Sequence, residues 1–381
     1  MPFKCGLLGR KLAHSKSPEI HRALGDYEYR LYEKEPEEAR EFLLHGDYDV
    51  VNVTIPYKRT AFELCHEMSA VAAELGNVNV VVKRLDGRLF GDNTDACGFG
   101  ELLRAVGAEV GGRKCVVLGS GGAGGTAAAV LRAKGAAQVV VVSRSGEDNY
   151  GNLGRHGDAS VIVNATPVGM YPDCDSLPVS LDLFPRCEAV IDLIYNPSPT
   201  RLLAEAEKRG IANIGGGLML EAQARAASVY MNANLYLYGA PGSGKSTIAK
   251  KLAAAKAMPL VDLDAEIERR EGRTIKEIFA TDGEAAFRRM EKDALRRVAS
   301  GRGQVVALGG GALLDAESRQ TAESSGRVVL VECPAEVLAK RISASSARPL
   351  LAGDAAKKLS ALLSSRREHY ESFSERLKYE R

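Results

Sequence analysis

Residues 234–247 read NLYLYGAPGSGKST, an apolar run followed by a glycine-rich turn and the start of a helical segment. The turn fits the pattern G-x-x-x-x-G-K-[ST]. Its glycines let backbone N–H groups curl round a phosphate at a helix N-terminus, while Lys245 neutralises phosphate charge and the Ser246 hydroxyl can bind Mg²⁺. The stretch predicts a strand, a phosphate-binding loop and a helix, which open a nucleotide-binding domain.

The same alternation of strand and helix runs through the whole chain. Short runs rich in Val and Ile alternate with segments of helical period, which is typical of α/β folds with mostly parallel sheets. The runs before the loop include VVNVTI, CVVLG, VVVV and VIVNAT, and those after it PLVDLD, QVVALGGG and RVVLVEC. The second series begins near Met231, directly after the helical segment LEAQARAASVY, so the main domain boundary is predicted there.

Composition narrows the function classes. The chain has 381 residues, with 51 Lys and Arg against 49 Asp and Glu, so no global charge favours nucleic acid or anionic membrane. Its seven cysteines have no C-x-x-C spacing, which indicates reduced thiols in the cytoplasm. No stretch approaches the roughly 20 apolar residues of a membrane span. The expected partners are small molecules, and the sequence leaves the choice between monomer and homodimer open.

A second glycine-rich element, VVLGSGGAGGT at residues 116–126, lies between an apolar strand and the helical AAAVLRAKG, with the strand QVVVVSR next. This βαβ frame predicts dinucleotide binding, with the pyrophosphate at the helix N-terminus. An NAD enzyme would place Asp or Glu at the tip of the following strand, where this chain has Ser143 and Arg144. Arg suits a 2′-phosphate, so NADP(H) is favoured, although Glu147 is close in sequence.

The C-terminal half resembles the shikimate kinase family through four ordered signatures after the loop. They are Asp262 and Asp264 in VDLD, Phe287 and Arg288 in AAFRRME, Gly309, Gly310 and Gly311 in ALGGGA, and Arg348 in ARPLL. The resemblance implies direct phosphoryl transfer from Mg·ATP to shikimate, in which positioning and charge neutralisation supply most of the acceleration.

That resemblance assigns roles residue by residue. It makes Asp264 the base, lets Asp262 reach Mg²⁺ through water beside Ser246, and makes Lys245 and Arg348 catalytic. A guanidinium pair grips the substrate carboxylate; Arg366 is preferred to Arg367 because it lies four residues before Tyr370. Substrate contacts are Asp264, Arg288, Gly310 and Arg366, and ATP contacts are Gly242, Ser243, Gly244, Lys245, Ser246, Thr247, Arg341 and Arg348.

The N-terminal half resembles the shikimate dehydrogenase family over residues 3–227. Six signatures occur in order: AHSKSPEIH, VVNVTIPYK, FGDNTD, NATPVGMYP, DLIYNP and GGGLMLEAQA. Reduction of a ketone by hydride needs a proton for the developing alkoxide, and the resemblance assigns that proton transfer to Lys58, with Asp95 beside it.

The remaining family positions divide between substrate and cofactor. The substrate pocket is expected to comprise Ser15, Ser17, Thr54, Asn79, Asp95, Tyr195 and Gln223. The NADP site is expected to comprise Gly119, Ser120, Gly121, Gly122, Ala123, Ser143, Arg144, Thr166, Leu193 and Gly216, with Gly169 also on the nicotinamide side.

The predicted organisation is an α/β substrate lobe at residues 1–95, a Rossmann-type NADP lobe at 96–230 with a return helix at about 216–230, and a P-loop α/β kinase domain of the NMP-kinase-like, shikimate kinase type at 231–381. Three departures from the families are noted: a short connection between Ser143 and Asn164, no further helix after the one carrying Gln223, and an end at SERLKYER before a final strand and helix.

The predicted function is bifunctional, reducing 3-dehydroshikimate with NADPH and then phosphorylating the shikimate formed. Two alternatives remain at this stage. One is an NAD-dependent quinate/shikimate dehydrogenase joined to a kinase for another small alcohol. The other is that one half binds its ligand without turnover.

Overall fold

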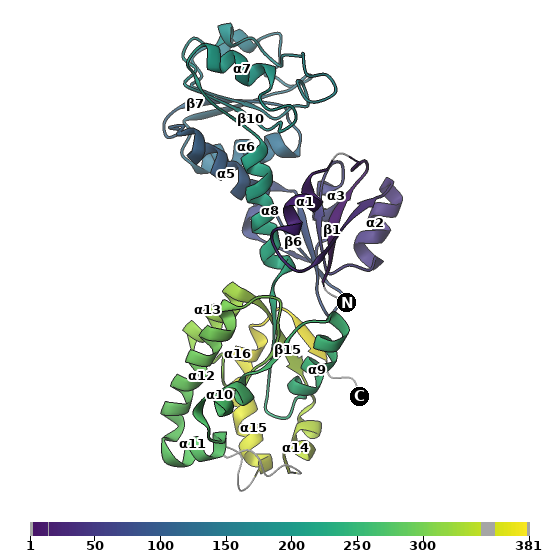
Figure 1. The fold of residues 1–381 in the computed structure, drawn as a ribbon, viewed down its shortest axis with the longest axis vertical. Coiled ribbons are helices and arrows are strands. Elements are labelled where there is room, and N and C mark those ends of the chain that lie inside the picture. Colours follow the sequence, from purple (N-terminus) through teal and green to yellow (C-terminus); the bar gives the residue numbers. More distant parts are fainter. Residues whose placement is uncertain (1–2, 14, 344–354, 379–381) are drawn as a thin grey trace.

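The computed structural model describes residues 3–13, 15–343 and 355–378. Three sheets follow one another along the chain, with strands β1 to β6, β7 to β11 and β12 to β16 (Figure 1). The sheet of β7 to β11 lies at one end of an elongated molecule, that of β12 to β16 at the other, and that of β1 to β6 between them (Figure 1).

The middle unit, called the substrate lobe after its predicted role, has a six-stranded sheet in the order β2-β1-β3-β5-β6-β4. Strand β5 runs antiparallel to both β3 and β6, whereas the other pairs are parallel. Its strands are β1 (Lys4–Gly9), β2 (Glu28–Glu33), β3 (Val50–Val53), β4 (Glu67–Met68), β5 (Val80–Lys83) and β6 (Leu89–Asp92). Its helices are α1 (Ser17–Arg22), α2 (Pro36–His45), α3 (Lys58–Leu64) and α4 (Ala70–Leu75).

The second lobe has a five-stranded, all-parallel sheet in the order β11-β10-β9-β7-β8. Its strands are β7 (Lys114–Leu118), β8 (Gln138–Val142), β9 (Val161–Asn164), β10 (Ala189–Asp192) and β11 (Ala212–Gly215). Helices α5 (Asp95–Val106), α6 (Gly122–Ala133), α7 (Arg201–Lys208) and α8 (Gly217–Met231) accompany them. Only the 3-10 turn η1 (Leu153–His156) lies between β8 and β9, whereas η2 (Leu181–Leu183) precedes β10.

The third sheet is also parallel, in the order β13-β14-β12-β15-β16. Its strands are β12 (Asn234–Tyr238), β13 (Leu260–Asp262), β14 (Val305–Ala307), β15 (Gly326–Glu332) and β16 (Arg376–Lys378). The helices are α9 (Lys245–Lys256), α10 (Leu263–Glu271), α11 (Ile275–Thr281), α12 (Gly283–Ser300), α13 (Ala316–Ser325), α14 (Ala335–Ser343), α15 (Ala355–Ser365) and α16 (Arg367–Glu371).

The expectation that SERLKYER stops before a final strand is wrong. Residues Arg376–Lys378 of that segment form β16, which pairs with β15 in parallel register, Leu330 opposite Arg376 and Glu332 opposite Lys378. The segment has only three strand residues and no continuous apolar run, so its strand character depends on pairing with a neighbour rather than on local pattern.

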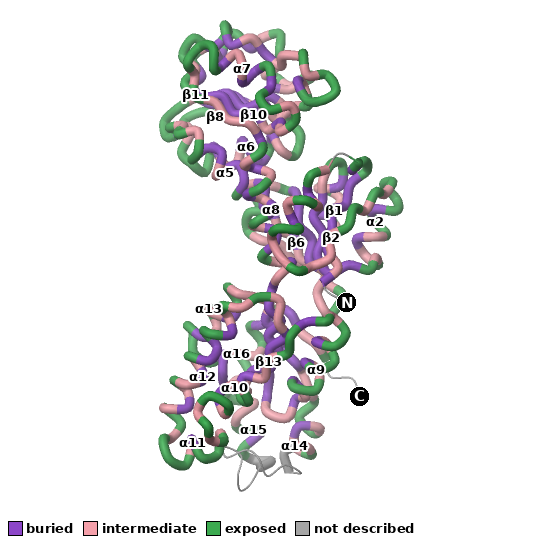
Figure 2. The backbone as a smooth tube through the Cα atoms, viewed as in Figure 1, coloured by how far each residue is buried: buried purple, intermediate pink, exposed green. Residues whose placement is uncertain are grey.

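The cores explain why the valine-rich runs form these sheets. Strands β3, β7, β9, β10, β12 and β14 are almost wholly buried (Figure 2), because each lies inside its sheet with neighbouring strands on both edges. Among the described helices, none combines the length and apolar character needed to cross a membrane.

A buried histidine makes the stability of the substrate lobe depend on pH. His21 of α1 is 1% exposed, stacks on Tyr29 with ring centroids 4.0 Å apart, and shares a 2.7 Å hydrogen bond with Tyr27. Burial lowers the pKa of His21 to about 4. The folded protein therefore keeps the imidazole neutral at pH values where the unfolded chain protonates it.

We expect the free energy of unfolding of this lobe to fall by on the order of 1 kcal/mol per pH unit as the pH drops from about 6.5 to 4. The stabilisation is present above pH 6.5 and is lost towards the folded-state pKa. Urea unfolding followed by circular dichroism across this range measures the slope. His21→Phe should flatten it, whereas His45→Phe, at an exposed end of α2, should leave it unchanged; equal slopes in all three proteins would contradict the prediction.

Candidate active sites

An ion pair joins the first residues of two helices, α3 of the substrate lobe and α5, which leads into the second lobe. Lys58 is the first residue of α3 and Asp95 the first of α5, and Lys58 Nζ lies 2.5 Å from Asp95 Oδ2. The side chains are 17% and 11% exposed. A cation is unfavourable at a helix N-terminus and a carboxylate favourable, so Asp95 offsets the cost of placing Lys58 there.

A chain of hydrogen bonds connects several predicted substrate residues. Ser17 N–H donates to Ser15 Oγ (3.2 Å). Tyr29 Oη donates to Asn52 Oδ1 (3.0 Å), and Asn52 Nδ2 donates to Asn79 O (3.5 Å). These bonds join Ser15 to Ser17, and Asn79 to Tyr29 through Asn52.

Asn79 continues this network to the ion pair. Its Nδ2 donates to Thr94 Oγ1 (3.1 Å), and its Oδ1 accepts from Thr94 N (2.8 Å). Asp95, the next residue, donates its N–H to Asn93 Oδ1 (3.1 Å). Buried amide side chains thus fix the turn between β6 and α5 that carries the Asp95 carboxylate.

The predicted cofactor residues gather at one edge of the parallel sheet. Gly119, Ser143, Thr166, Leu193 and Gly216 follow the carboxyl ends of β7, β8, β9, β10 and β11. This is the edge where open α/β sheets bind ligands. Ser120 and Gly121 form the turn from β7 into α6, and Gly122 and Ala123 are the first two residues of α6.

At two positions of this glycine-rich segment, steric constraints explain why the residue is glycine. Gly119 has φ +106°, a conformation that other residues rarely adopt. A Cβ on Gly124 would lie 2.0 Å from Gly119 O, so α6 can approach the end of β7 only without a side chain there. The residues present therefore fit a dinucleotide pyrophosphate at the N-terminus of α6.

The ion pair and the glycine-rich turn face each other across the two lobes. A Cβ placed on Gly122 would lie 3.8 Å from Lys58 Cδ. This brings the Lys58 side chain into van der Waals range of the predicted pyrophosphate turn, although the two residues belong to different lobes.

The other predicted residues surround this region less closely. Thr54 follows β3, where its N–H donates to Leu8 O (2.9 Å). Gln223 lies on α8 and donates to Leu220 O (2.9 Å), and Tyr195 is half-buried after β10. No hydrogen bond among the described residues links Tyr195 or Gln223 to Lys58 or Asp95. Arg144 is exposed, and within the described part of the chain no ion pair joins it to Glu147.

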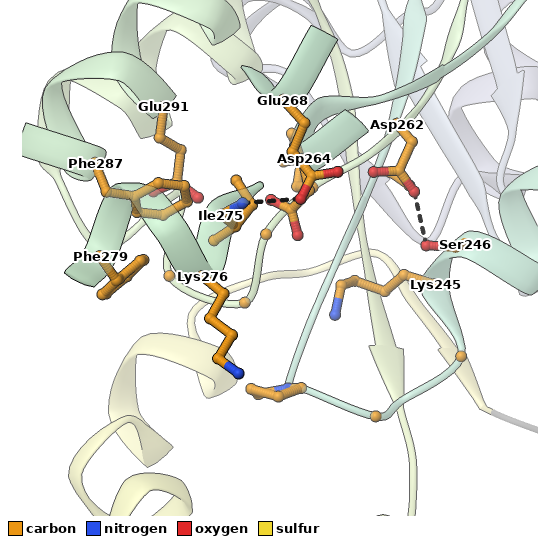
Figure 3. Close-up of a pocket in the computed structure, with 18 of the residues that line it drawn as sticks. Lys245, Ser246, Asp262, Asp264, Glu268, Ile275, Lys276, Phe279, Phe287 and Glu291 are labelled. Carbon is orange, nitrogen blue, oxygen red and sulfur yellow. Dashed lines mark hydrogen bonds between the residues drawn. The ribbon is translucent and has the colours of Figure 1, made fainter. Parts of the chain in front are cut away.

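The kinase domain contains a cavity of about 890 Å³ above the carboxyl ends of β12, β13 and β14 (Figure 3). Helices α10, α11 and α12 form one wall and the phosphate-binding loop the other. Nearly all the predicted kinase residues line it: Gly242, Gly244, Lys245, Ser246, Thr247, Asp262, Asp264, Phe287, Arg288, Gly309, Gly310, Gly311, Arg341 and Arg366. Ser243 is fully buried and lies outside the lining.

The loop is shaped for phosphate and a divalent cation. Lys245 Nζ donates to the carbonyl oxygens of Gly239 (2.9 Å) and Ala240 (3.0 Å). Ser246 Oγ donates to Asp262 Oδ2 (2.9 Å), so the two predicted Mg²⁺ groups are in contact (Figure 3). Hydroxyl and carboxylate oxygens are the ligands that Mg²⁺ prefers.

A second ion pair lies at the opposite wall. Arg288 Nη1 is 2.6 Å from Glu291 Oε2 and Arg288 Nη2 is 3.2 Å from Glu284 Oε1. The Glu291 side chain is 4% exposed, and burial raises its pKa above the ordinary value while Arg288 and Arg366 oppose the shift. With a guanidinium at 2.6 Å, the Glu291 carboxylate fixes the direction of Arg288.

The glycine run makes room for these groups. A Cβ on Gly309 would lie 2.5 Å from Glu291 Oε1, and one on Gly311 would lie 2.8 Å from the Arg288 guanidinium. Larger residues would displace the ion pair from the cavity.

Two further arginines, Arg341 and Arg366, line the cavity. Arg366 Nη1 donates to Gly310 O (2.7 Å), whereas Arg367 pairs with Glu371 on the exposed surface at 2.8 Å. Arg341 Nη1 donates to Gly242 O (3.1 Å) in the phosphate-binding loop. Arg348 lies outside the described residues.

Sequence reasoning missed four residues. Asn52 bridges Tyr29 and Asn79, and its signal was a lone amide inside the apolar run VVNV. Glu291 orients Arg288 from one helical turn away, a spacing that the sequence does display. Glu268 Oε1 accepts from Ile275 N (2.8 Å) and so fixes the start of α11, and Lys276 lines the cavity (Figure 3).

The folds and sites define the class: a dinucleotide-dependent oxidoreductase of two lobes, joined to a P-loop kinase. Residues 7–81 match the family model of the shikimate dehydrogenase substrate binding domain, and residues 241–380 match that of shikimate kinase. A shikimate dehydrogenase (NADP(+)) from Clostridium perfringens is 33% identical over 239 residues, covering 57% of this chain and 88% of that protein. One from Shouchella clausii is 38% identical, with the same coverage.

A solved structure agrees. Shikimate 5-dehydrogenase from Thermus thermophilus, in complex with NADP(H) and shikimate, matches with a TM-score of 0.55 and 33% identity, covering 60% of this chain and 93% of that one. The chain belongs to the shikimate dehydrogenase family, and it carries a shikimate kinase domain in the same polypeptide.

The two carboxylates beside Arg288 should differ in their effect on the KM for shikimate. Glu291→Gln removes a buried charge that orients Arg288, and we expect the KM for shikimate in the kinase reaction to rise about tenfold with little change in the KM for ATP. Glu284→Gln is the matched control, because its carboxylate is 54% exposed and such pairs contribute little. Steady-state kinetics of ADP release measure both; equal effects of the two substitutions would contradict this role for Glu291.

Proposed function

We propose that this chain catalyses two consecutive reactions, reduction of 3-dehydroshikimate by NADPH and phosphorylation of the 3-hydroxyl of shikimate by Mg·ATP. The proposal rests most directly on the contact of Lys58 with Asp95 beside the glycine-rich turn at Gly122, together with the cavity that unites the phosphate-binding loop with Asp264 and Arg288. The product of the first site is the substrate of the second.

In the dehydrogenase, NADPH supplies the hydride. Lys58 donates the proton that the developing alkoxide requires, and Asp95 holds the ammonium in position. Ser15, Ser17, Thr54, Asn79, Tyr195 and Gln223 are assigned to the substrate, because hydroxyl and amide groups recognise a polyol carboxylate by hydrogen bonding. The cofactor groups are those at the carboxyl edge of β7 to β11, with Arg144 at the 2′-phosphate.

In the kinase, ATP supplies the phosphoryl group. Asp264 accepts the proton of the attacking hydroxyl, Arg288 and Arg366 bind the substrate carboxylate, and Gly310 lets the ring approach the backbone. Lys245 and Arg348 neutralise charge on the transferring phosphate, Arg341 is assigned to the nucleotide, and Ser246 and Asp262 hold Mg²⁺, Asp262 through water.

Residues 1–95, 96–230 and 231–381 are assigned to the substrate lobe, the NADP lobe and the kinase domain. We place the protein in the cytoplasm, where NADPH and ATP are available. The alternative of an NAD-dependent quinate/shikimate dehydrogenase is not favoured, since Arg144 stands where an acidic residue would bind the ribose.

Lys58→Met tests the first reaction. We expect the dehydrogenase kcat to fall by roughly 10²–10⁴-fold while ATP-dependent phosphorylation of shikimate is unchanged, because the loss is confined to proton transfer. NADPH oxidation with 3-dehydroshikimate measures the effect. Arg59→Met, which removes the neighbouring cation with an 86% exposed side chain, should keep full activity. A Lys58→Met enzyme of undiminished kcat would refute the assignment.

Lys245→Met tests the second reaction. We expect the kinase kcat to fall by on the order of 10²–10³-fold, because the charge that stabilises the transferring phosphate is lost. NADPH-dependent reduction should be unaffected. Lys250→Met, on an exposed position of α9, is the matched control. Shikimate-dependent ADP formation is the measurement, and unchanged turnover in Lys245→Met would sink the kinase assignment.

A further inference from the structure

The substrate lobe and the kinase domain share one apolar cluster. From the substrate lobe it includes Phe3, Cys5, Val50, Val80 and Val82, and from α8 Ala227 and Met231. From the kinase domain it includes Leu235, Leu237, Ala249, Ala253, Met258, Val305, Ala307, Val329 and Val331. Figure 1 shows the two directly adjacent, whereas the NADP lobe lies at the far end. The two therefore bury a common core, which a loosely tethered domain would not do.

A buried ion pair of the kinase sheet contacts the dehydrogenase backbone. Arg327 and Glu375 lie 2.5 Å apart with side chains 12% and 6% exposed. Glu375 Oε1 also accepts from Leu85 N (3.1 Å), and Arg327 Nη2 donates to Lys83 O (3.5 Å). Lys83 is the last residue of β5, and Leu85 lies in the turn between β5 and β6. Separating the domains would leave this backbone N–H and carbonyl without their partners.

A second charged contact lies at the C-terminal end of the helix that follows the phosphate-binding loop. Helix α9 starts at Lys245 and ends at Lys256, which pairs with Asp49 at the start of β3. The Asp49 side chain is 11% exposed and its Oδ2 also accepts from Lys4 N (3.0 Å). Lys256 Nζ lies 5.8 Å from the Phe3 ring centroid. One rigid helix thus connects the nucleotide loop to the edge of the dehydrogenase sheet.

Both contacts are on strands that lead to the dehydrogenase site. β5 and β6 extend from the turn at Leu85 to Asn79 and to the turn before Asp95, and β3 extends from Asp49 towards Thr54 and Lys58. The kinase therefore packs under the sheet at the end opposite to the substrate residues.

We propose that the kinase domain has a second function, as the structural support of the dehydrogenase substrate lobe, so that the two unfold as one cooperative unit. A ligand that binds the folded kinase then stabilises the dehydrogenase by mass action, without touching it. This consequence rests on the proposed nucleotide site, whereas the support itself does not.

The test uses the intact chain, heated at a series of temperatures and then assayed for oxidation of shikimate with NADP⁺. With MgADP at about 100 times its Kd, we expect the temperature of half-inactivation of the dehydrogenase to rise by on the order of 4 °C. If MgADP protects the kinase activity and leaves the dehydrogenase unprotected, the proposal is overturned.

Leu85→Asp separates the domains locally, because it puts a carboxylate where an apolar side chain packs against the shared cluster. We expect the half-inactivation temperature of the dehydrogenase to fall by on the order of 5 °C and its protection by MgADP to disappear, while the kinase remains protected. Leu31→Asp is the matched control, since Leu31 is 39% exposed on β2 of the same lobe. Equal shifts in both variants would refute the proposal.

Two further measurements distinguish a failure of the proposed nucleotide site from a failure of the structural support. If calorimetry detects no MgADP binding, the nucleotide site is wrong, and the comparison of Leu85→Asp with Leu31→Asp still decides whether the kinase supports the lobe. If Leu85→Asp does not fold, Lys256→Met removes the contact with Asp49 and keeps the aliphatic stem. It should lower the half-inactivation temperature by on the order of 2 °C and reduce the MgADP effect; no change in either would count against the proposal.

Discussion

The position of α8 determines how the three parts of this molecule fit together. The helix leaves the NADP sheet after β11, packs closely on α5, and continues into β12 through only Asn232 and Ala233. A Cβ on Gly98 would lie 2.8 Å from Met219 O, so α5 and α8 can approach this closely only at a glycine. Further along, Tyr230 Oη donates to Asp92 Oδ2 (2.7 Å) in the substrate lobe. One helix therefore contacts both dehydrogenase lobes and leads directly into β12 of the kinase sheet.

Both proposed active sites hold a lysine at the first residue of a helix. Lys58 begins α3 and Lys245 begins α9, where the helix dipole disfavours positive charge. Oxygen neighbours offset the cost in each case, the Asp95 carboxylate for Lys58 and two loop carbonyls for Lys245. These oxygens hold the ammonium groups close to backbone N–H groups that favour anions. The arrangement suits both an alkoxide that needs a proton and a phosphate that needs a counter-charge.

Local patterns predicted most of the fold. Short apolar runs predicted the buried strands β7, β9 and β12, because a parallel strand buried on both faces is a continuous apolar run. The glycine-rich turn between β7 and α6 was visible for a different reason. Positive φ at Gly119 and close packing at Gly124 exclude other residues there. β16 was missed, because Arg376–Lys378 is a strand only where β15 offers it a partner.

By itself, the sequence determined the three α/β units, the two glycine-rich turns and the residue types of both proposed sites, because these depend on local periodicity and on short spacings. Only the tertiary structure decided that Lys58 faces Gly122, that Glu291 orients Arg288, and that Glu375 meets Leu85 from 290 residues away along the chain. Such contacts depend on how sheets and helices pack against one another. No local pattern in the sequence encodes the partner of a side chain across a domain boundary.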